Sequence, residues 1–315
     1  MPSMSSSMPQ LDGGLFLTDG GIETSLIFHD GLELPLFAAF VLLADEAGTA
    51  ALRRYWRPYL ALAREAATGF VFESPTWRAS RDWGERLGYS AAALAAVNRR
   101  AMQLGAELRR QAPGTRVVLS GCIGPRGDGY RPEALMDSAE AADYHAAQAK
   151  ALAEGGAELV TAITMTHSGE AIGVVRAAEA AGLSAVISFT VETDGRLPTG
   201  QSLGEAIAEV DAATSAAPAY YMLNCAHPTH FADVLRAAGP WAQRLRGIRA
   251  NASCRSHAEL DAAADLDDGD PAELAAQYAE LRRMLPRLVV LGGCCGTDQR
   301  HLYAIARACG CLSAA

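Results

Sequence analysis

The stretch that decides the fold is residues 288–298, LVVLGGCCGTD. Four apolar residues without alternation, Leu288–Leu291, predict a strand that is buried on both faces, as in a parallel sheet. Gly292–Gly293 let the backbone turn sharply, and Thr297–Asp298 are typical of a helix start. A buried strand, a turn with reactive side chains and a helix therefore form one β/α unit.

The same unit recurs along the whole chain. Seven further apolar runs, each followed by a helical stretch, lie at Leu15–Thr18, Phe70–Phe72, Val117–Leu119, Leu159–Val160, Ala185–Phe189, Tyr220–Leu223 and Ile248–Ala250. Eight such units predict an α/β fold, a single (β/α)8 TIM barrel. The alternative, an open doubly wound sheet, would more naturally carry a glycine-rich phosphate loop. Asp19-Gly20-Gly21 is rich in glycine but lacks that spacing.

Capping residues, prolines and glycines mark the expected helix boundaries. Ser90 is expected to cap a helix over residues 91–111, and Pro58 to kink or split the first helix. The other expected boundaries are a helix from Pro132 to Gly155–Gly156, one from Ser168 to Gly182, and helix starts at Asp270–Pro271 and Thr297–Asp298.

Composition narrows the class of protein. The chain has 315 residues, of which 50% are hydrophobic and 20% charged, with a net charge of −9. This charge argues against a nucleic-acid partner, and no apolar run is long enough to span a membrane. Residues 1–10 are small, polar and rich in Met and Ser, and they do not resemble a signal peptide. We therefore expect a disordered tail before a single domain over 11–315 and a cytoplasmic protein.

Polar or reactive side chains follow most of the predicted strands, where barrel enzymes place their catalytic groups. They include Asp19, Glu73, Cys122, Asn224, Cys225, Asn251, Cys294 and Cys295. A single cysteine on a buried strand is usually a small hydrophobic residue. Three cysteines on one rim instead indicate a zinc site with an open fourth position. Cys225, Cys294 and Cys295 are the predicted ligands, and His227 and His230 are not needed to complete four-coordination.

Several of these motifs resemble those of a known enzyme family. The run Gly292–Thr297, together with Asn224-Cys225, Thr18–Gly21 and Gly121–Pro125, resembles the homocysteine S-methyltransferase family from about residue 13 to 308. The resemblance implies a TIM barrel, a Zn2+ held by three cysteines and homocysteine as methyl acceptor. The family's donors include S-methylmethionine, S-adenosylmethionine and betaine, and a chain without room for folate or cobalamin domains points to a sulfonium or other onium donor.

The expected partners are therefore a small-molecule thiol acceptor and a methyl donor. The residues expected to bind them are Asp19, Gly20, Glu73, Trp77, Arg78 and Asn224. With the resemblance, Asp19 is expected to hold the amino group of the acceptor. The chain departs from the family at Ile163, where relatives usually carry the glutamate that holds this amino group. Glu73 is the candidate replacement, although a salt bridge from Glu73 to Arg78 or Arg81 is an equal alternative.

Three other functions stay open from the sequence. A methyltransferase acting on a different thiol, or a barrel that binds zinc or thiols without catalysis, would both accommodate Ile163. A zinc hydrolase would more usually use histidine and carboxylate ligands. The sequence does not determine the oligomeric state.

Overall fold

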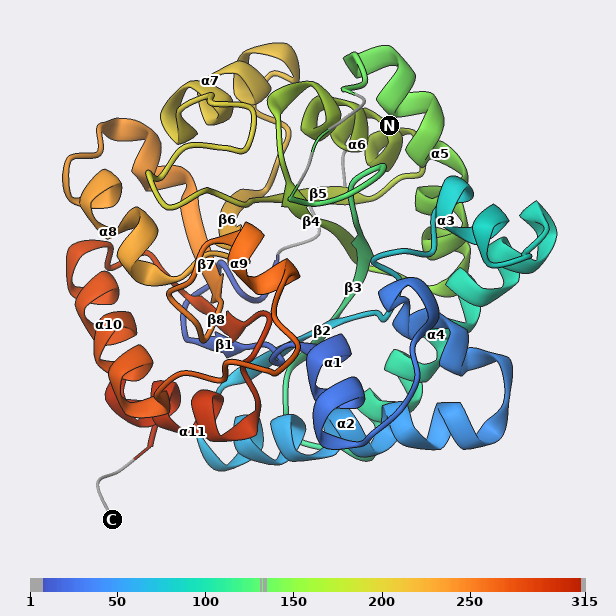
Figure 1. The fold of residues 1–315 in the computed structure, drawn as a ribbon, viewed down its shortest axis with the longest axis horizontal. Helices are drawn as coiled ribbons and strands as arrows, with labels where there is room; N and C mark the ends of the chain where they lie inside the picture. The colour runs from blue at the N-terminus through green and yellow to red at the C-terminus, as the bar shows by residue number, and fades with distance from the viewer. Residues whose placement is uncertain (1–7, 131, 133–134, 313–315) are drawn as a thin grey trace.

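The computed structural model describes residues 8–312 except 131, 133 and 134. Eight parallel strands form a closed barrel in the order β1 to β8, and β1 closes the barrel by pairing with β8. Helices surround the barrel on the outside (Figure 1). The strands are β1 (Phe16–Leu17), β2 (Gly69–Glu73), β3 (Val117–Ile123), β4 (Leu159–Met165), β5 (Ser184–Phe189), β6 (Tyr220–Asn224), β7 (Leu245–Ala250) and β8 (Val290–Gly293).

Helices follow the strands, with several short additions in the loops. The α-helices are α1 (Ile22–Thr24), α2 (Glu46–Glu65), α3 (Arg81–Arg86), α4 (Ala91–Gln111), α5 (Ser138–Gly155), α6 (Ser168–Ala180), α7 (Leu203–Ala213), α8 (Pro228–Arg236), α9 (His257–Asp261), α10 (Pro271–Met284) and α11 (Gln299–Ala308). A π-helical turn covers Ser25–His29, and 3₁₀ turns cover Pro35–Phe37, Ala39–Ala44 and Pro240–Arg244.

The predicted TIM barrel and all eight of its strands are confirmed. The seventh strand is longer than predicted, because it carries Arg246 and Arg249 and so shows no continuous apolar run. The helix over 91–111 is confirmed, and its cap Ser90 accepts a hydrogen bond from the Ala93 amide at 3.2 Å. The starts of α10 and α11 are also confirmed.

One predicted helix start is wrong, and of the two effects expected of Pro58, a kink or a split, the split is excluded. The helix expected from Pro132 begins instead at Ser138, where the Asp137 carboxylate accepts bonds from the amides of Ala139 and Glu140. Helix α2 runs unbroken through Pro58, so this proline does not split it. A third boundary shifts by one residue, because His167 rather than Ser168 occupies the N-cap of α6.

Apolar side chains fill the part of the barrel near the starts of the strands, and polar side chains lie at the other end. Alternate strand residues point to opposite faces, so Leu17 packs with the helix-facing core, whereas Phe16 belongs to a second cluster with Val71, Val118 and Tyr220. These apolar residues come from the early parts of their strands. The polar side chains at the strand ends therefore gather at the opposite, C-terminal rim.

The first described residues of the chain contact this second cluster. Gln10 is fully buried and its Nε2 donates to the Tyr220 hydroxyl at 3.4 Å, while Met8 contacts the cluster. These contacts involve residues 8 and 10 of the tail expected over 1–10, and residues 1–7 lie outside the described residues. Among the described residues, no helix has the length and apolar character needed to cross a membrane.

Candidate active site and metal centre

Three cysteine sulfurs meet at the C-terminal rim. Cys225 directly follows β6, and Cys294 and Cys295 directly follow β8. Their sulfur atoms all lie within 4.8 Å of one another. Cys225 and Cys294 form a disulfide in this structure, and Cys295 is a free thiol. The predicted convergence of the three residues is thus present in the fold.

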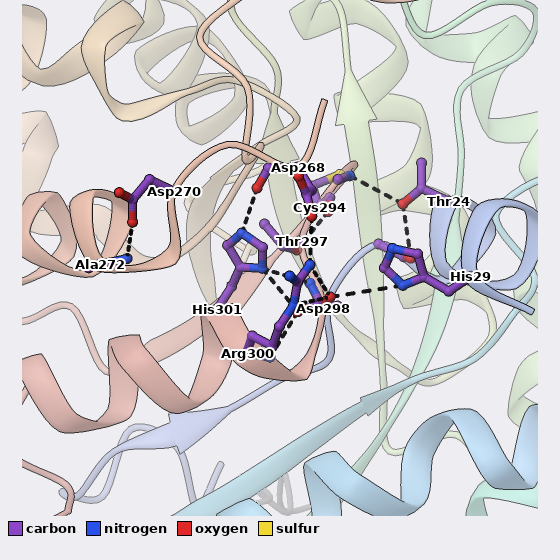
Figure 2. Close-up of polar contacts among 12 residues, drawn as sticks. Thr24, His29, Asp268, Asp270, Ala272, Cys294, Thr297, Asp298, Arg300 and His301 are labelled. Carbon is purple, nitrogen blue, oxygen red and sulfur yellow. Dashed lines mark hydrogen bonds and ion pairs between the residues drawn. The ribbon is translucent and has the colours of Figure 1, made fainter. Parts of the chain in front are cut away.

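The turn that carries Cys294 is held on both sides (Figure 2). The Cys294 carbonyl accepts from the Thr297 hydroxyl at 2.7 Å, and the Gly296 amide donates to the Thr24 hydroxyl at 3.2 Å. Just beyond the turn, Asp298 caps α11 and also pairs with Arg300 at 2.8 Å. These contacts fix the turn between the start of α11 and the first loop of the barrel.

Cys225 is held through its backbone. Its φ of 52° lies in the left-handed region, which is uncommon for a residue with a side chain. The Cys225 carbonyl accepts from His257 Nε2 at 2.6 Å and from Asn251 Nδ2 at 3.1 Å. Tyr130 stacks on the His257 ring, with 4.0 Å between centroids, and its hydroxyl lies 3.7 Å from the Cys295 sulfur.

A cavity of about 380 Å³ opens beside the three sulfurs. Five of the six residues predicted to bind substrate line it together with the cysteines: Asp19, Gly20, Glu73, Trp77 and Arg78. Ile163 also lines the cavity. The structure therefore brings the predicted substrate residues and the predicted metal ligands into one space.

Asn224 is not among the residues that line this cavity. Its Oδ1 accepts from the Thr164 amide at 2.9 Å and from the Ser188 hydroxyl at 2.6 Å, and its Nδ2 donates to the Thr164 hydroxyl at 2.8 Å. Thr164 has a φ of 68°, and the β4–β5 register shifts here. The Asn224 amide thus fixes the end of β4, which places Ile163 in the cavity wall.

Asp19 lies two residues after β1, and its buried carboxylate has one oxygen in a hydrogen bond and the other, Oδ1, in an ion pair but without a hydrogen bond among the described residues. Its Oδ1 pairs with Arg249 Nη2 at 2.9 Å, and its Oδ2 accepts from the Tyr55 hydroxyl at 3.1 Å. Burial raises the pKa of Asp19, although the positive charge of Arg249 opposes this effect. The group expected to hold an ammonium therefore already has a cationic partner within the protein.

Glu73, at the end of β2, has one free oxygen. Its Oε1 accepts from the Thr161 hydroxyl at 2.9 Å, whereas its buried Oε2 has no hydrogen-bond partner among the described residues. Burial raises the pKa of Glu73 to about 7, and it raises the pKa of Glu23 in the same cavity to about 7. Both carboxyls therefore change charge near neutral pH.

Trp77 and Arg78 form one wall. The Trp77 indole Nε1 donates to the Ile163 carbonyl at 3.2 Å. The Arg78 guanidinium lies over the Trp83 ring at 4.0 Å and over the Trp77 ring at 4.9 Å, and it donates to the Leu36 carbonyl. Within the described chain, no ion pair joins Glu73 to Arg78 or Arg81, so that alternative is not realised.

Sequence reasoning missed many of the residues that line this cavity, and three of them bear on its chemistry. Glu23, Tyr130 and Arg249 all line it but are absent from the predicted site. Tyr130 lies in a loop and Glu23 in the short helix α1 that follows β1, and the sequence does not indicate the shape of either segment. Arg249 did give a signal, because an arginine within a strand predicted to be buried requires a charged partner.

The donor set fits a zinc ion once Cys225 and Cys294 are reduced. Zinc prefers sulfur and nitrogen ligands, and three protein ligands leave one position for a substrate. Burial raises the pKa of the Cys295 thiol to about 11. A nearby cation would favour the thiolate by compensating its charge.

The homocysteine S-methyltransferase family model matches residues 16–309, which is nearly the whole chain. The chain belongs to the homocysteine S-methyltransferase family. Members of this family transfer methyl groups to thiols, so the chain is a thiol S-methyltransferase. No curated protein matches the chain significantly.

Solved structures agree on the fold. The homocysteine methyltransferase MmuM from Escherichia coli, in its oxidized form, superposes with a TM-score of 0.73 at 19% identity, covering 93% of this chain and 95% of MmuM. Its metallated form gives a TM-score of 0.69 at 18% identity, covering 94% and 96%. At this level of identity the likeness extends to the barrel architecture.

Proposed function

We propose that this protein is a zinc-dependent S-methyltransferase that moves a methyl group from a sulfonium or other onium donor to homocysteine, which gives methionine. The observation that carries the proposal is the meeting of three cysteine sulfurs within 4.8 Å beside a cavity of about 380 Å³. The proposal places the enzyme in the cytoplasm, where a reducing environment keeps Cys225 and Cys294 as thiols.

The charge of the cavity supports a cationic donor. Its walls carry more acids than bases, since the only basic side chains among its lining residues are Arg78 and Arg249, against the acidic Asp19, Glu23, Glu73, Asp128, Asp261, Asp265 and Asp267. An acidic and partly aromatic wall attracts an onium group, because cations are also favoured over aromatic faces.

The chain's own residues would position the reactants. Cys225, Cys294 and Cys295 would hold the zinc, which when bound lowers the pKa of a coordinated acceptor thiol. Glu73 Oε2 would accept a hydrogen bond from the acceptor's ammonium. Because one cavity holds both reactants, attack on the donor methyl becomes effectively intramolecular, which supplies much of the rate.

Zinc content and methyl transfer test the proposal together. Zinc in the purified, reduced protein is measured beside methionine formation from homocysteine with S-methylmethionine, S-adenosylmethionine or betaine. We expect about one zinc per chain and activity with at least one donor. In Cys225→Ala we expect both to be lost, because two thiolates bind zinc far more weakly than three.

Cys254→Ala is the matched control, because Cys254 is exposed and lies outside the three-sulfur cluster. It should keep both zinc and activity. Full zinc in Cys225→Ala would remove the metal assignment, and a zinc-loaded protein that methylates no thiol with any of these donors would contradict the function.

A further inference from the structure

Arg249 is a buried charge with unused hydrogen-bond donors. It is 7% exposed and lines the cavity beside the sulfurs. Its Nε donates to the Gly293 carbonyl at 3.0 Å, and its Nη2 donates to the Gly20 carbonyl at 3.2 Å and pairs with Asp19. Its Nη1 has no partner among the described residues. Because a buried unpaired donor is costly, Nη1 points to an acceptor that the chain itself does not supply.

The neighbouring strand is shaped for this arginine. Arg249 faces Gly292 in the β7–β8 register, and a Cβ at Gly292 would lie 1.9 Å from Thr18 Oγ1 and 3.2 Å from Arg249 Cγ. Glycine in β8 therefore leaves space for Thr18 and for the arginine side chain, which reaches from β7 to Asp19 just after β1. Asp19 and two carbonyls then hold the guanidinium in one orientation.

Two carboxylate oxygens of this cavity accept no hydrogen bond among the described residues, and since Asp19 Oδ1 already faces Arg249, the acceptor left for a ligand belongs to Glu73. Its Oε2 is buried without a partner, as Arg249 Nη1 is. Both residues line the cavity that contains the three sulfurs. An unpaired carboxylate oxygen and an unpaired guanidinium nitrogen together match the ammonium and the carboxylate of an amino acid.

We propose that Arg249 determines acceptor specificity by binding the acceptor's carboxylate through Nη1, so that the enzyme selects thiols that also carry a carboxylate. This inference rests on the proposed function and identifies the chemistry that the site recognises. The competing role for Arg249 is purely structural, namely neutralising the buried Asp19. In the first role, replacing Arg249 weakens only the binding of acceptors that carry a carboxylate. In the structural role, it weakens the binding of all acceptors equally.

Two acceptors first test, without any mutation, whether the enzyme recognises the acceptor's carboxylate. Homocysteine and 3-aminopropane-1-thiol share the thiol and the amine, and only homocysteine has the carboxylate. We expect calorimetry with the reduced, zinc-loaded protein to show that 3-aminopropane-1-thiol binds roughly 10- to 100-fold more weakly, the range for losing a charge-assisted hydrogen bond. Equal affinity for both would overturn the inference.

Arg249→Lys then assigns the effect to this residue. Lysine keeps a positive charge beside Asp19 but lacks the planar fork that binds a carboxylate. We expect homocysteine binding to weaken roughly 10-fold while 3-aminopropane-1-thiol binding changes less than about 3-fold. If both acceptors weaken equally, Arg249 only supports Asp19.

Arg244→Lys is the matched control. Arg244 pairs with Asp211 through two nitrogens, lies just before β7 and does not line the cavity, so its replacement should leave both affinities unchanged. If Arg249→Lys does not fold, equal affinity of the wild-type protein for both thiols still overturns the inference. Methylation of both thiols with equal affinity would refute this inference only, whereas failure to bind or methylate either thiol would refute the proposed function as well.

Discussion

Glu73 occupies a position where burial opposes its negative charge. Because burial raises its pKa to about 7 from an ordinary 4.5, the folded protein retains this proton to higher pH than the unfolded chain. Below pH 4.5 the carboxyl is protonated in both states and costs nothing. As the pH rises from 4.5 to 7, the Glu73 carboxyl ionises only in the unfolded state, so its contribution lowers the free energy of unfolding more and more. Above pH 7 it is ionised in both states, and this contribution stays constant.

We therefore predict that Glu73→Gln becomes more stable relative to wild type as the pH rises from 5 to 8. The expected relative gain is about 2–3 kcal/mol, from 1.36 kcal/mol per pKa unit. Urea unfolding of the metal-free, reduced proteins at several pH values measures it. Glu179→Gln, at an exposed position on α6, is the control. If the difference in the free energy of unfolding between wild type and Glu73→Gln does not change with pH, burial does not disfavour the ionised carboxylate.

At the scale of elements, two glycine turns pack directly against each other. Gly20 and Gly21 follow β1, and the Cys294–Thr297 turn follows β8. The Gly21 amide donates to the Thr297 carbonyl at 3.0 Å, and a Cβ on Gly21 would lie only 2.6 Å from the Cys294 carbonyl oxygen. The φ of Gly21 is an ordinary −78°, so its backbone conformation does not require glycine. Glycine is needed here because the two backbones approach each other closely.

We predict that Gly21→Ala displaces Cys294 and weakens zinc binding. The added methyl group meets backbone, which yields less readily than a side-chain end, so we also expect a loss of stability of about 1–3 kcal/mol. Competition with a chromogenic chelator gives the zinc affinity, and urea unfolding gives the stability. Gly239→Ala is the control, because a Cβ there has no neighbour closer than 3.7 Å and its φ is −81°. Unchanged zinc affinity in Gly21→Ala would show that the turns move apart freely.

At the scale of the whole molecule, the metal ligands join distant parts of the barrel. Cys225 and Cys294 are separated by 69 residues and belong to different strand–helix units. A zinc ion held between them forms only in the folded barrel, so its binding free energy adds to the stability of the native state. A disulfide between the same two residues removes two of the three thiolates from the site.

We accordingly predict that zinc raises the melting temperature of the reduced protein and leaves that of the oxidised protein unchanged. At a zinc concentration 1,000 times the dissociation constant, the gain is about 4 kcal/mol. Thermal unfolding with zinc, with zinc plus chelator, and with magnesium measures it, and magnesium should have no effect because it prefers oxygen ligands. An equal shift in the oxidised protein would place the zinc at a site other than these cysteines.

The fold could be predicted from the sequence because each β/α unit carries its own local signal. Unbroken apolar runs such as Leu288–Leu291 require burial on both faces, and capping residues such as Ser90 and Asp298 mark the helix starts. The grouping of the cysteines followed from the same pattern, since residues after parallel strands meet at one rim. The start of α5 was missed because Pro132 resembles a helix start but lies in the loop that Asp137 ends.

By itself, then, the sequence determined the barrel and the set of residues at its rim, because strand burial and strand ends are local properties. The pairing of their charges was decided only by the tertiary structure. Arg249 reaches Gly20 across 229 residues of sequence, and Asn224 turns its amide to Thr164 rather than to the cavity. These contacts depend on the closure of β8 against β1 and on the register of β4. Neither is encoded within any single segment, because both arise when the eight strands pack as one barrel.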